Sequence, residues 1–165
     1  MKSSLTYQDI EAAFHASRRR LLCVDDNSYF LTGVCHFLAT CGHEATKATT
    51  DREALDLIQA DPTHYDAVLV ADPLHNADTL ALAGALLAGG YQGRLMIKSP
   101  NLSSSRREGY QALGIHVFVP VPVDLYKLLS QVEAAVRLSS VPPAQPVATD
   151  EGRTIPSSAP VAEAP

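Results

Sequence analysis

The sequence predicts an α/β domain in which helices cover both faces of a five-stranded parallel sheet. Short apolar runs alternate with helical patterns five times between about residue 20 and residue 138, which is typical of a doubly wound sheet. The runs at residues 21–24 and 67–71 are continuously apolar, as strands buried on both faces are. The first run stops at Asp25-Asp26, at the sheet edge where open α/β folds bind their ligands.

The other elements follow from the same patterns and from their start and stop signals. Thr50 and Glu53 have the spacing of a capping box, in which the Glu53 side chain reaches back to the backbone of residue 50. Glycines at 42, 89–90 and 114 end the preceding helices. Helices are therefore expected at 28–40, 51–60, 79–88, 104–113 and from 124 onward, and the other strands at 44–48, 95–97 and 117–119.

The two ends of the chain differ from this domain. Residues 1–18 form an N-terminal extension, with a helix expected over 6–19 because Tyr7, Ile10 and Phe14 recur at helical spacing. This helix either packs on the flank of the domain or docks a partner. Residues 139–165 hold six of the 11 prolines and no apolar period, so a disordered tail is expected there. The folded domain is thus assigned to residues 19–138.

Composition narrows the function classes. The formal net charge of −5 disfavours nucleic-acid binding as the main role. No apolar run has the length of a membrane span, and no signal-peptide pattern is present, so a soluble cytoplasmic protein without membrane attachment is expected. Cys35 and Cys41 lie six residues apart on one expected helix and so on separate faces, which argues against a zinc site with His36 and His43.

Several landmarks occur in a specific order. An Asp-Asp pair ends the first strand, Tyr-Asp-Ala-Val-Leu-Val at 65–70 leads into the third, Ser99 ends the fourth, and Phe118 and Pro122 accompany the fifth. In these features residues 19–138 resemble the receiver domain of bacterial response regulators. The resemblance implies a flavodoxin-like fold with strand order 2-1-3-4-5.

The resemblance also implies a chemistry. In receivers, an aspartate at the end of strand three accepts a phosphoryl group from a kinase phosphohistidine, near Mg²⁺ held by the strand-one acids. A lysine before the strand-five proline pairs with the phosphoryl oxygens. On this chain Asp25 and Asp26 match the metal ligands, Ser99 and Phe118 match the switch residues, and Pro122 matches the cis-proline.

Two positions depart from the receiver pattern. The acceptor position is Ala71 and the lysine position is Val121. Losing the anion and the cation together leaves neither as an uncompensated charge. The sequence therefore predicts a degenerate receiver, or pseudo-receiver, with no catalytic residue and no required cofactor. Mg²⁺ binding by Asp25 and Asp26 is expected to be weak or vestigial, since a third carboxylate ligand is missing.

Two alternatives remain open. Asp72 becomes the acceptor if the register slips by one residue, which would make the chain a phosphorylatable single-domain response regulator with Mg²⁺ at Asp25 and Asp26. Because neighbouring strand residues face opposite sides, this alternative needs a bulge. In the other, the acidic crevice senses a small molecule. Lys98 is expected to point away from Ser99, and His75 to be a solvated loop residue.

The function that fits these departures is protein–protein interaction in two-component, or phosphorelay, signal transduction. By the resemblance, the expected contact face comprises the helix at 104–113, the strand at 117–119 and the helix that begins at 124. The partner class is a histidine kinase or another response regulator, and a homodimer through this face is a further option. An enzymatic activity is expected only if Asp72 accepts a phosphoryl group.

Overall fold

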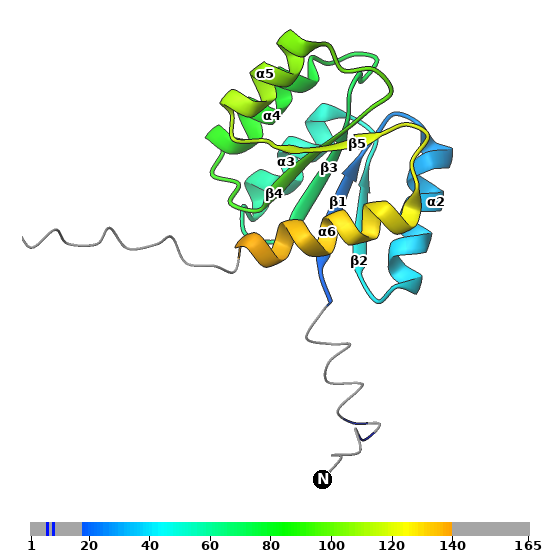
Figure 1. Cartoon of the computed structure of the whole chain (residues 1–165). Helices are drawn as coiled ribbons and strands as arrows, with labels where there is room; N and C mark the ends of the chain where they lie inside the picture. Colours follow the sequence, from blue (N-terminus) through cyan, green and yellow to red (C-terminus); the bar gives the residue numbers. More distant parts are fainter. Residues whose placement is uncertain (1–5, 7, 9–17, 140–165) are drawn as a thin grey trace, which may run out of the picture.

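A five-stranded parallel sheet forms the centre of the computed structural model, which describes residues 6, 8 and 18–139, and of 138 and 139 only the backbone. The strands are β1 (Arg20–Val24), β2 (Glu44–Ala48), β3 (Ala67–Ala71), β4 (Arg94–Ser99) and β5 (Val117–Pro120). Their order is β2-β1-β3-β4-β5, and all neighbours are parallel. The flavodoxin-like fold expected from the sequence is confirmed (Figure 1).

Helices alternate with the strands and cover both faces of the sheet. They are α2 (Ser28–Thr40), α3 (Asp51–Ala60), α4 (Thr79–Ala88), α5 (Ser104–Ala112) and α6 (Leu125–Ser139). An N-cap residue precedes each of the helices α2 to α5, and its side chain accepts a backbone N–H of the first turn. The four N-caps are Asn27, Thr50, Asp78 and Ser103. None of the helices that the structure describes is long and apolar enough to cross a bilayer.

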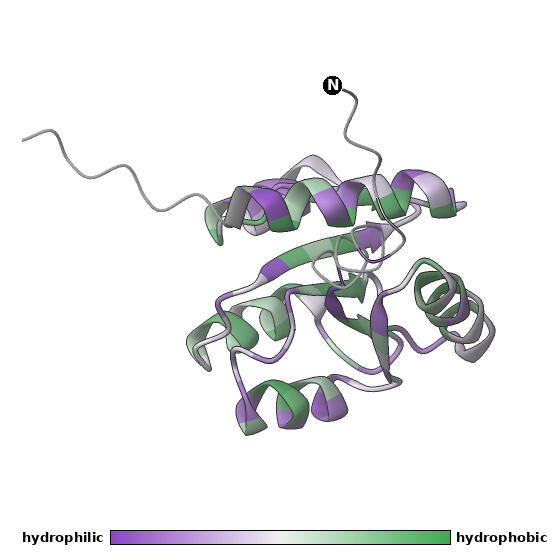
Figure 2. Ribbon diagram, turned by 90° about the horizontal axis from the view of Figure 1, so that it is seen from below, coloured by the Kyte–Doolittle hydropathy of each residue, from purple (hydrophilic) through white to green (hydrophobic). Residues whose placement is uncertain are grey.

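The core has two halves, one on each face of the sheet. One half packs the buried side chains of α3, α4 and α5 against the sheet, and the other packs those of α2 and α6. Leu22 and Val24 face the first half, whereas Leu21 and Cys23 face the second, as the alternation of side chains along a strand requires. In Figure 2 hydrophobic strands form the middle layer, and helices that carry both hydrophobic and polar residues form the outer layers.

The structure differs from the expected elements in a few details. β4 runs from Arg94 to Ser99, longer at both ends than expected. The Glu53 carboxylate accepts the N–H of Thr49 at 2.6 Å rather than that of Thr50, although Thr50 caps Glu53 as expected. Arg18 and Arg19 are not helical, so the helix expected over 6–19 does not reach them. The rest of that helix and the tail lie outside the described residues, apart from residues 6 and 8.

His43 is a buried titratable residue in the loop between α2 and β2. Only 6% of the residue is exposed, and its Nδ1 accepts the backbone N–H of Arg19 at 3.2 Å. Burial lowers the pKa of His43, although the nearby Glu133 carboxylate acts in the opposite direction. The folded protein therefore favours the neutral ring.

The stability of the protein should depend on pH through His43. Because its pKa is lower in the folded state, this contribution is complete above the ordinary histidine pKa of about 6.5 and is lost as pH falls below it. We expect the free energy of unfolding in urea to decrease between pH 7 and pH 5.5, by at most about 1.4 kcal/mol per pH unit. His43→Gln should remove this slope, and His36→Gln, at an exposed position of α2, should keep it. A slope that is unchanged in His43→Gln would contradict the assignment.

Candidate functional site

Asp25 is a buried carboxylate at the end of β1, with 4% of its side chain exposed. Its Oδ2 forms an ion pair with the Lys98 ammonium, and its Oδ1 accepts the backbone N–H of Asn27 at 2.9 Å. The Lys98 Nζ also lies 3.9 Å from the centroid of the Phe30 ring, within cation–π range. The carboxylate is thus satisfied by groups of the chain itself.

Asp26, the second acid, is bonded to the loop that follows β3. Its Oδ2 accepts the backbone N–H of His75 at 2.7 Å and also pairs with the Nδ1 of the same residue. Slight burial raises the pKa of Asp26, but the His75 hydrogen bonds outweigh it, so the pKa lies below its ordinary value. His75 is 87% exposed in its side chain, as expected for a loop residue, yet it is a partner of the acidic turn.

Lys98 reaches Asp25 from two strands away. The sheet register pairs Val24 with Val70 and Ala71 with Lys98, so β3 lies between the two charged residues. Strand alternation within β4 predicts that Lys98 points away from Ser99, and in the structure Lys98 binds Asp25 whereas Ser99 lines the cleft beside Asp72. Alternation does not account for the four-carbon stem of lysine, which lets the ammonium group extend across a neighbouring strand.

The acceptor and lysine positions of the receiver pattern are both apolar in the structure. Ala71 is 4% exposed, and its carbonyl accepts the Thr79 hydroxyl at 3.0 Å. Val121 is 41% exposed and precedes Pro122 through a cis peptide bond. Neither side chain can accept a phosphoryl group or pair with one.

Asp72, the alternative acceptor, faces α5. The residue is 4% exposed, and its Oδ2 accepts Arg106 Nε at 2.5 Å and the Tyr110 hydroxyl at 2.8 Å. Its backbone N–H donates to the carbonyl of Lys98 at 2.8 Å, so the pairing with β4 continues through Asp72 without a bulge. The partners of the Asp72 carboxylate therefore differ from those of the Asp25 and Asp26 carboxylates.

Arg106 links two carboxylates of the β3–α4 segment to α5. Besides Asp72, it binds Asp78, with Nη2 3.0 Å from Oδ1. The hydrogen bond to Asp72 raises the pKa of Arg106, and the hydrogen bond from Arg106 lowers the pKa of Asp78. Burial and the contact with Asp72 raise the pKa of Tyr110. The sequence motifs did not indicate Arg106 or Tyr110, because these residues lie 34 and 38 residues after Asp72 in the chain.

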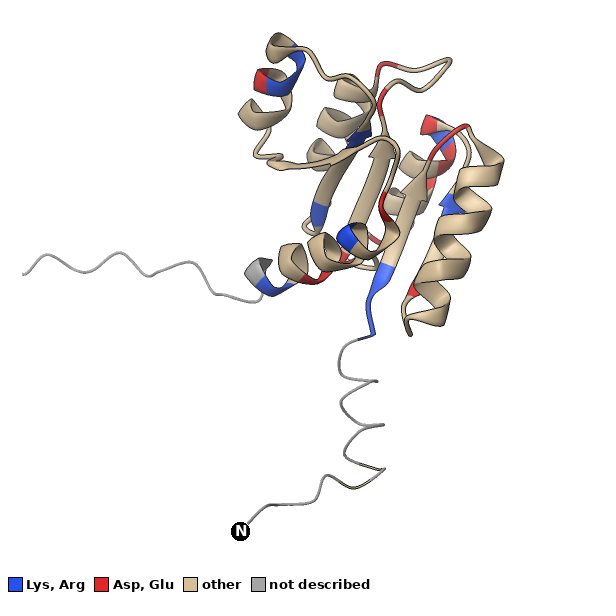
Figure 3. Ribbon diagram, turned by 45° about the vertical axis from the view of Figure 1, so that its right-hand side comes forward, with Lys and Arg blue, Asp and Glu red and all other residues tan. Residues whose placement is uncertain are grey.

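A cleft of about 660 Å³ lies beside this network. It is lined by the 72–78 loop together with Ser99, Asn101 and Arg106. Asp25 and Asp26 do not line it, and Asp26 instead borders a cavity of about 60 Å³, which is room for about two water molecules. The small-molecule alternative stays a prediction, and the larger space available to a ligand lies beside Asp72 rather than beside Asp26. Figure 3 shows acidic residues along the upper edge of the sheet, where the strands end.

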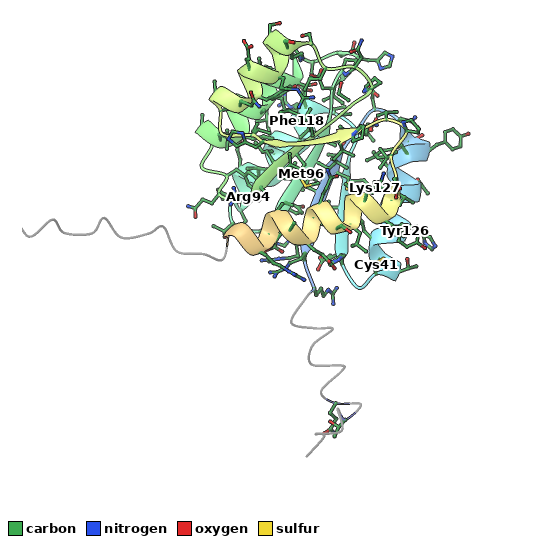
Figure 4. All side chains as sticks on the ribbon, viewed as in Figure 1. Cys41, Arg94, Met96, Phe118, Tyr126 and Lys127 are labelled. Carbon is green, nitrogen blue, oxygen red and sulfur yellow. The ribbon has the colours of Figure 1, made fainter. Side chains whose placement is uncertain are left out.

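Phe118 and Ser99, the residues matched to the receiver switch, lie on neighbouring strands. Phe118 is half-buried on β5, with the Arg107 guanidinium carbon 4.4 Å from its ring centroid and the Tyr110 ring at 6.2 Å (Figure 4). Ser99 borders the cleft next to Asp72. The two residues are thus separate from the Lys98–Asp25 pair, and their role as a switch stays a prediction.

The residues present do not fit the Mg²⁺ that receivers bind. The metal would need hard oxygen ligands in near-octahedral geometry. Asp25 is paired with Lys98, Asp26 with His75, and Ala71 supplies no oxygen side chain. No group of three His, Cys, Asp or Glu side chains arranged to hold a metal occurs among the residues that the structure describes.

Comparisons with known proteins place the fold. No protein-family model and no curated protein matches the sequence. Among solved structures, a Francisella response regulator receiver domain is 20% identical, with a TM-score of 0.66 over 74% of this chain and 99% of the other. A CheY-like receiver domain protein from Methanospirillum hungatei is 19% identical, with a TM-score of 0.69 over 74% and 96%. A two-component response regulator from Clostridium difficile is 17% identical, with a TM-score of 0.69 over 75% and 100%. These similarities and the strand order show that the chain has the fold of response-regulator receiver domains.

Proposed function

We propose that this chain acts by protein–protein interaction in two-component signal transduction, as a receiver-like module whose state does not depend on phosphorylation. The observation that carries the proposal is the engagement of Asp72 by Arg106 and Tyr110. A phosphoryl acceptor must present a carboxylate oxygen to the incoming phosphorus. Here Asp72 is the carboxylate next to the apolar acceptor position Ala71, and it is buried and bonded to α5.

The position of the cation near Asp25 supports the same proposal. Lys98 supplies a positive charge next to Asp25 at the end of β1. It comes from β4, whereas the lysine of the receiver pattern lies just before the strand-five proline. The family lysine would pair with a phosphoryl group at β3, whereas Lys98 pairs with Asp25 without one. The buried charge of Asp25 is therefore compensated in the unmodified chain.

The proposed contact face consists of α5, β5 and the first turns of α6. β5 is the edge strand of the sheet, so one side of its backbone has no neighbouring strand among the described residues. Tyr126 is 76% exposed on the adjacent first turn of α6, where Figure 4 labels it next to Lys127. Its ring packs edge-on against Phe37 of α2, with the two ring centroids 5.4 Å apart, and exposed tyrosines are common in docking surfaces. A histidine kinase, another response regulator or a second copy of this chain fits the proposal. One structural neighbour is described as a receiver domain dimer activated by beryllofluoride.

The proposal is tested by incubating the full chain with acetyl phosphate and Mg²⁺ and measuring its intact mass. We expect no added phosphoryl group, while an intact receiver domain treated in parallel gains one. Asp72→Asn is the matched variant. A mass gain in the natural chain that is lost in Asp72→Asn would replace this proposal with the phosphorylatable alternative.

A further inference from the structure

Each acid of the β1–α2 turn is paired with a basic side chain from a different segment. Lys98 comes from β4 and His75 from the loop after β3. We propose that these two side chains occupy the place of a divalent cation in this turn, so that each acid is bonded to a side chain of the chain itself. The ion pairs would then hold the ends of β1, β3 and β4 together, as a shared metal ion would.

The Lys98–Asp25 pair is the main element of this arrangement because it is shielded from water. The Lys98 side chain is 13% exposed and that of Asp25 is 4% exposed. The Phe30 ring centroid lies 3.9 Å from the ammonium nitrogen. Charged groups attract more strongly in such surroundings than at a hydrated surface, and each would be costly to leave without the other.

Three of the four carboxylate oxygens of this turn already have partners. Asp25 Oδ1 accepts from Asn27 N–H and Oδ2 pairs with Lys98, while Asp26 Oδ2 pairs with His75 through two contacts. A divalent cation would have to displace Lys98 from a nearly enclosed position. The residue between Asp25 and Lys98 in the sheet is Ala71, so no third carboxylate competes for the ammonium group.

The charge balance is consistent with this role. The two carboxylates contribute −2 and the Lys98 ammonium contributes +1. Lys98 therefore offsets the buried charge of Asp25 without any bound ion. Removal of Lys98 would leave Asp25 buried next to Asp26 without a cation, which is the condition under which a metal ion gains affinity.

The experiment is a titration of the full chain with MgCl₂ followed by calorimetry, in the natural protein and in Lys98→Met. We expect no binding in the millimolar range for the natural protein. Lys98→Met, which keeps a similar apolar stem, should bind Mg²⁺ at least about tenfold more tightly, as expected for about 1.4 kcal/mol of added attraction. Lys127→Met, at an exposed lysine of α6, should behave like the natural protein.

A second readout keeps the test informative if Lys98→Met folds poorly. Its melting temperature should be lower than that of the natural protein and should rise on addition of Mg²⁺. The double variant Lys98→Met with Asp25→Asn should regain stability without responding to Mg²⁺. The proposal is overturned if the natural protein binds Mg²⁺ at millimolar concentration or below, or if folded Lys98→Met shows no gain in Mg²⁺ affinity. Neither outcome depends on phosphorylation, so this test is separate from that of the proposed function.

Discussion

Replacing Arg106 with methionine should lower the free energy of unfolding by about 3 kcal/mol, as is typical when a buried ion pair loses one partner. The physical reason is the location of Asp72, whose side chain is 5% exposed and would keep the Tyr110 hydroxyl but no cation among the partners described for it. Arg106 itself is 33% exposed, so water can reach part of the vacated space. This places the expected loss at the lower end of the range for buried pairs.

The substitution Asp72→Asn should lower the free energy of unfolding by less than Arg106→Met does. Asp72→Asn removes the buried charge, and Arg106 still has Asp78 within hydrogen-bond distance. The double variant Arg106→Met with Asp72→Asn should therefore be more stable than Arg106→Met alone. Urea unfolding at pH 7 measures all three. Arg107→Met is the matched control, since this neighbouring arginine is exposed and contacts only the Phe118 ring among the interactions described for it. A loss in Arg106→Met no larger than in the control would show that Asp72 does not depend on this pair.

A variant that carries the receiver residues at positions 71 and 121 should become phosphorylated. Ala71→Asp together with Val121→Lys supplies an acceptor at the end of β3 and a cation before Pro122. We expect this double variant to gain a phosphoryl group from acetyl phosphate in the presence of Mg²⁺, and we expect no such gain in the natural chain. Val121 is 41% exposed, so a lysine stem fits there without entering the core. The phosphorylated fraction should rise further when Lys98→Met frees Asp25.

The single substitution Ala71→Asp should be less stable than the double variant. It places a third carboxylate at a position that is 4% exposed, on the strand next to the one that ends at Asp25 and Asp26, and it competes with Asp25 for Lys98. Like charges crowded at a buried edge destabilise the folded state. Urea unfolding of both single variants and the double variant gives the coupling between the two sites. An additive result, with no coupling, would mean that the lysine introduced by Val121→Lys does not meet the carboxylate introduced by Ala71→Asp.

The sequence was sufficient to predict the fold because its signals are local. Continuous apolar runs mark strands buried on both faces, and the capping box of Thr50 and Glu53 marks a helix start. The alternation of five strands and five helices then leaves few arrangements that respect short connections and right-handed crossovers. The order of the landmarks from Asp25 to Pro122 supplied the strand order by resemblance.

The partners of the acidic residues were decided by the tertiary structure. Asp72 and Arg106 are 34 residues apart, and Asp25 and Lys98 are 73 residues apart, so no local pattern connects them. Strand alternation predicts which face a residue takes, as it did in arguing against a slipped register at Asp72. It does not predict how far a long side chain extends across neighbouring strands. Lys98 reaches Asp25 across β3 in this way. Arg106 instead reaches Asp72 from helix α5, which the fold packs beside the end of β3.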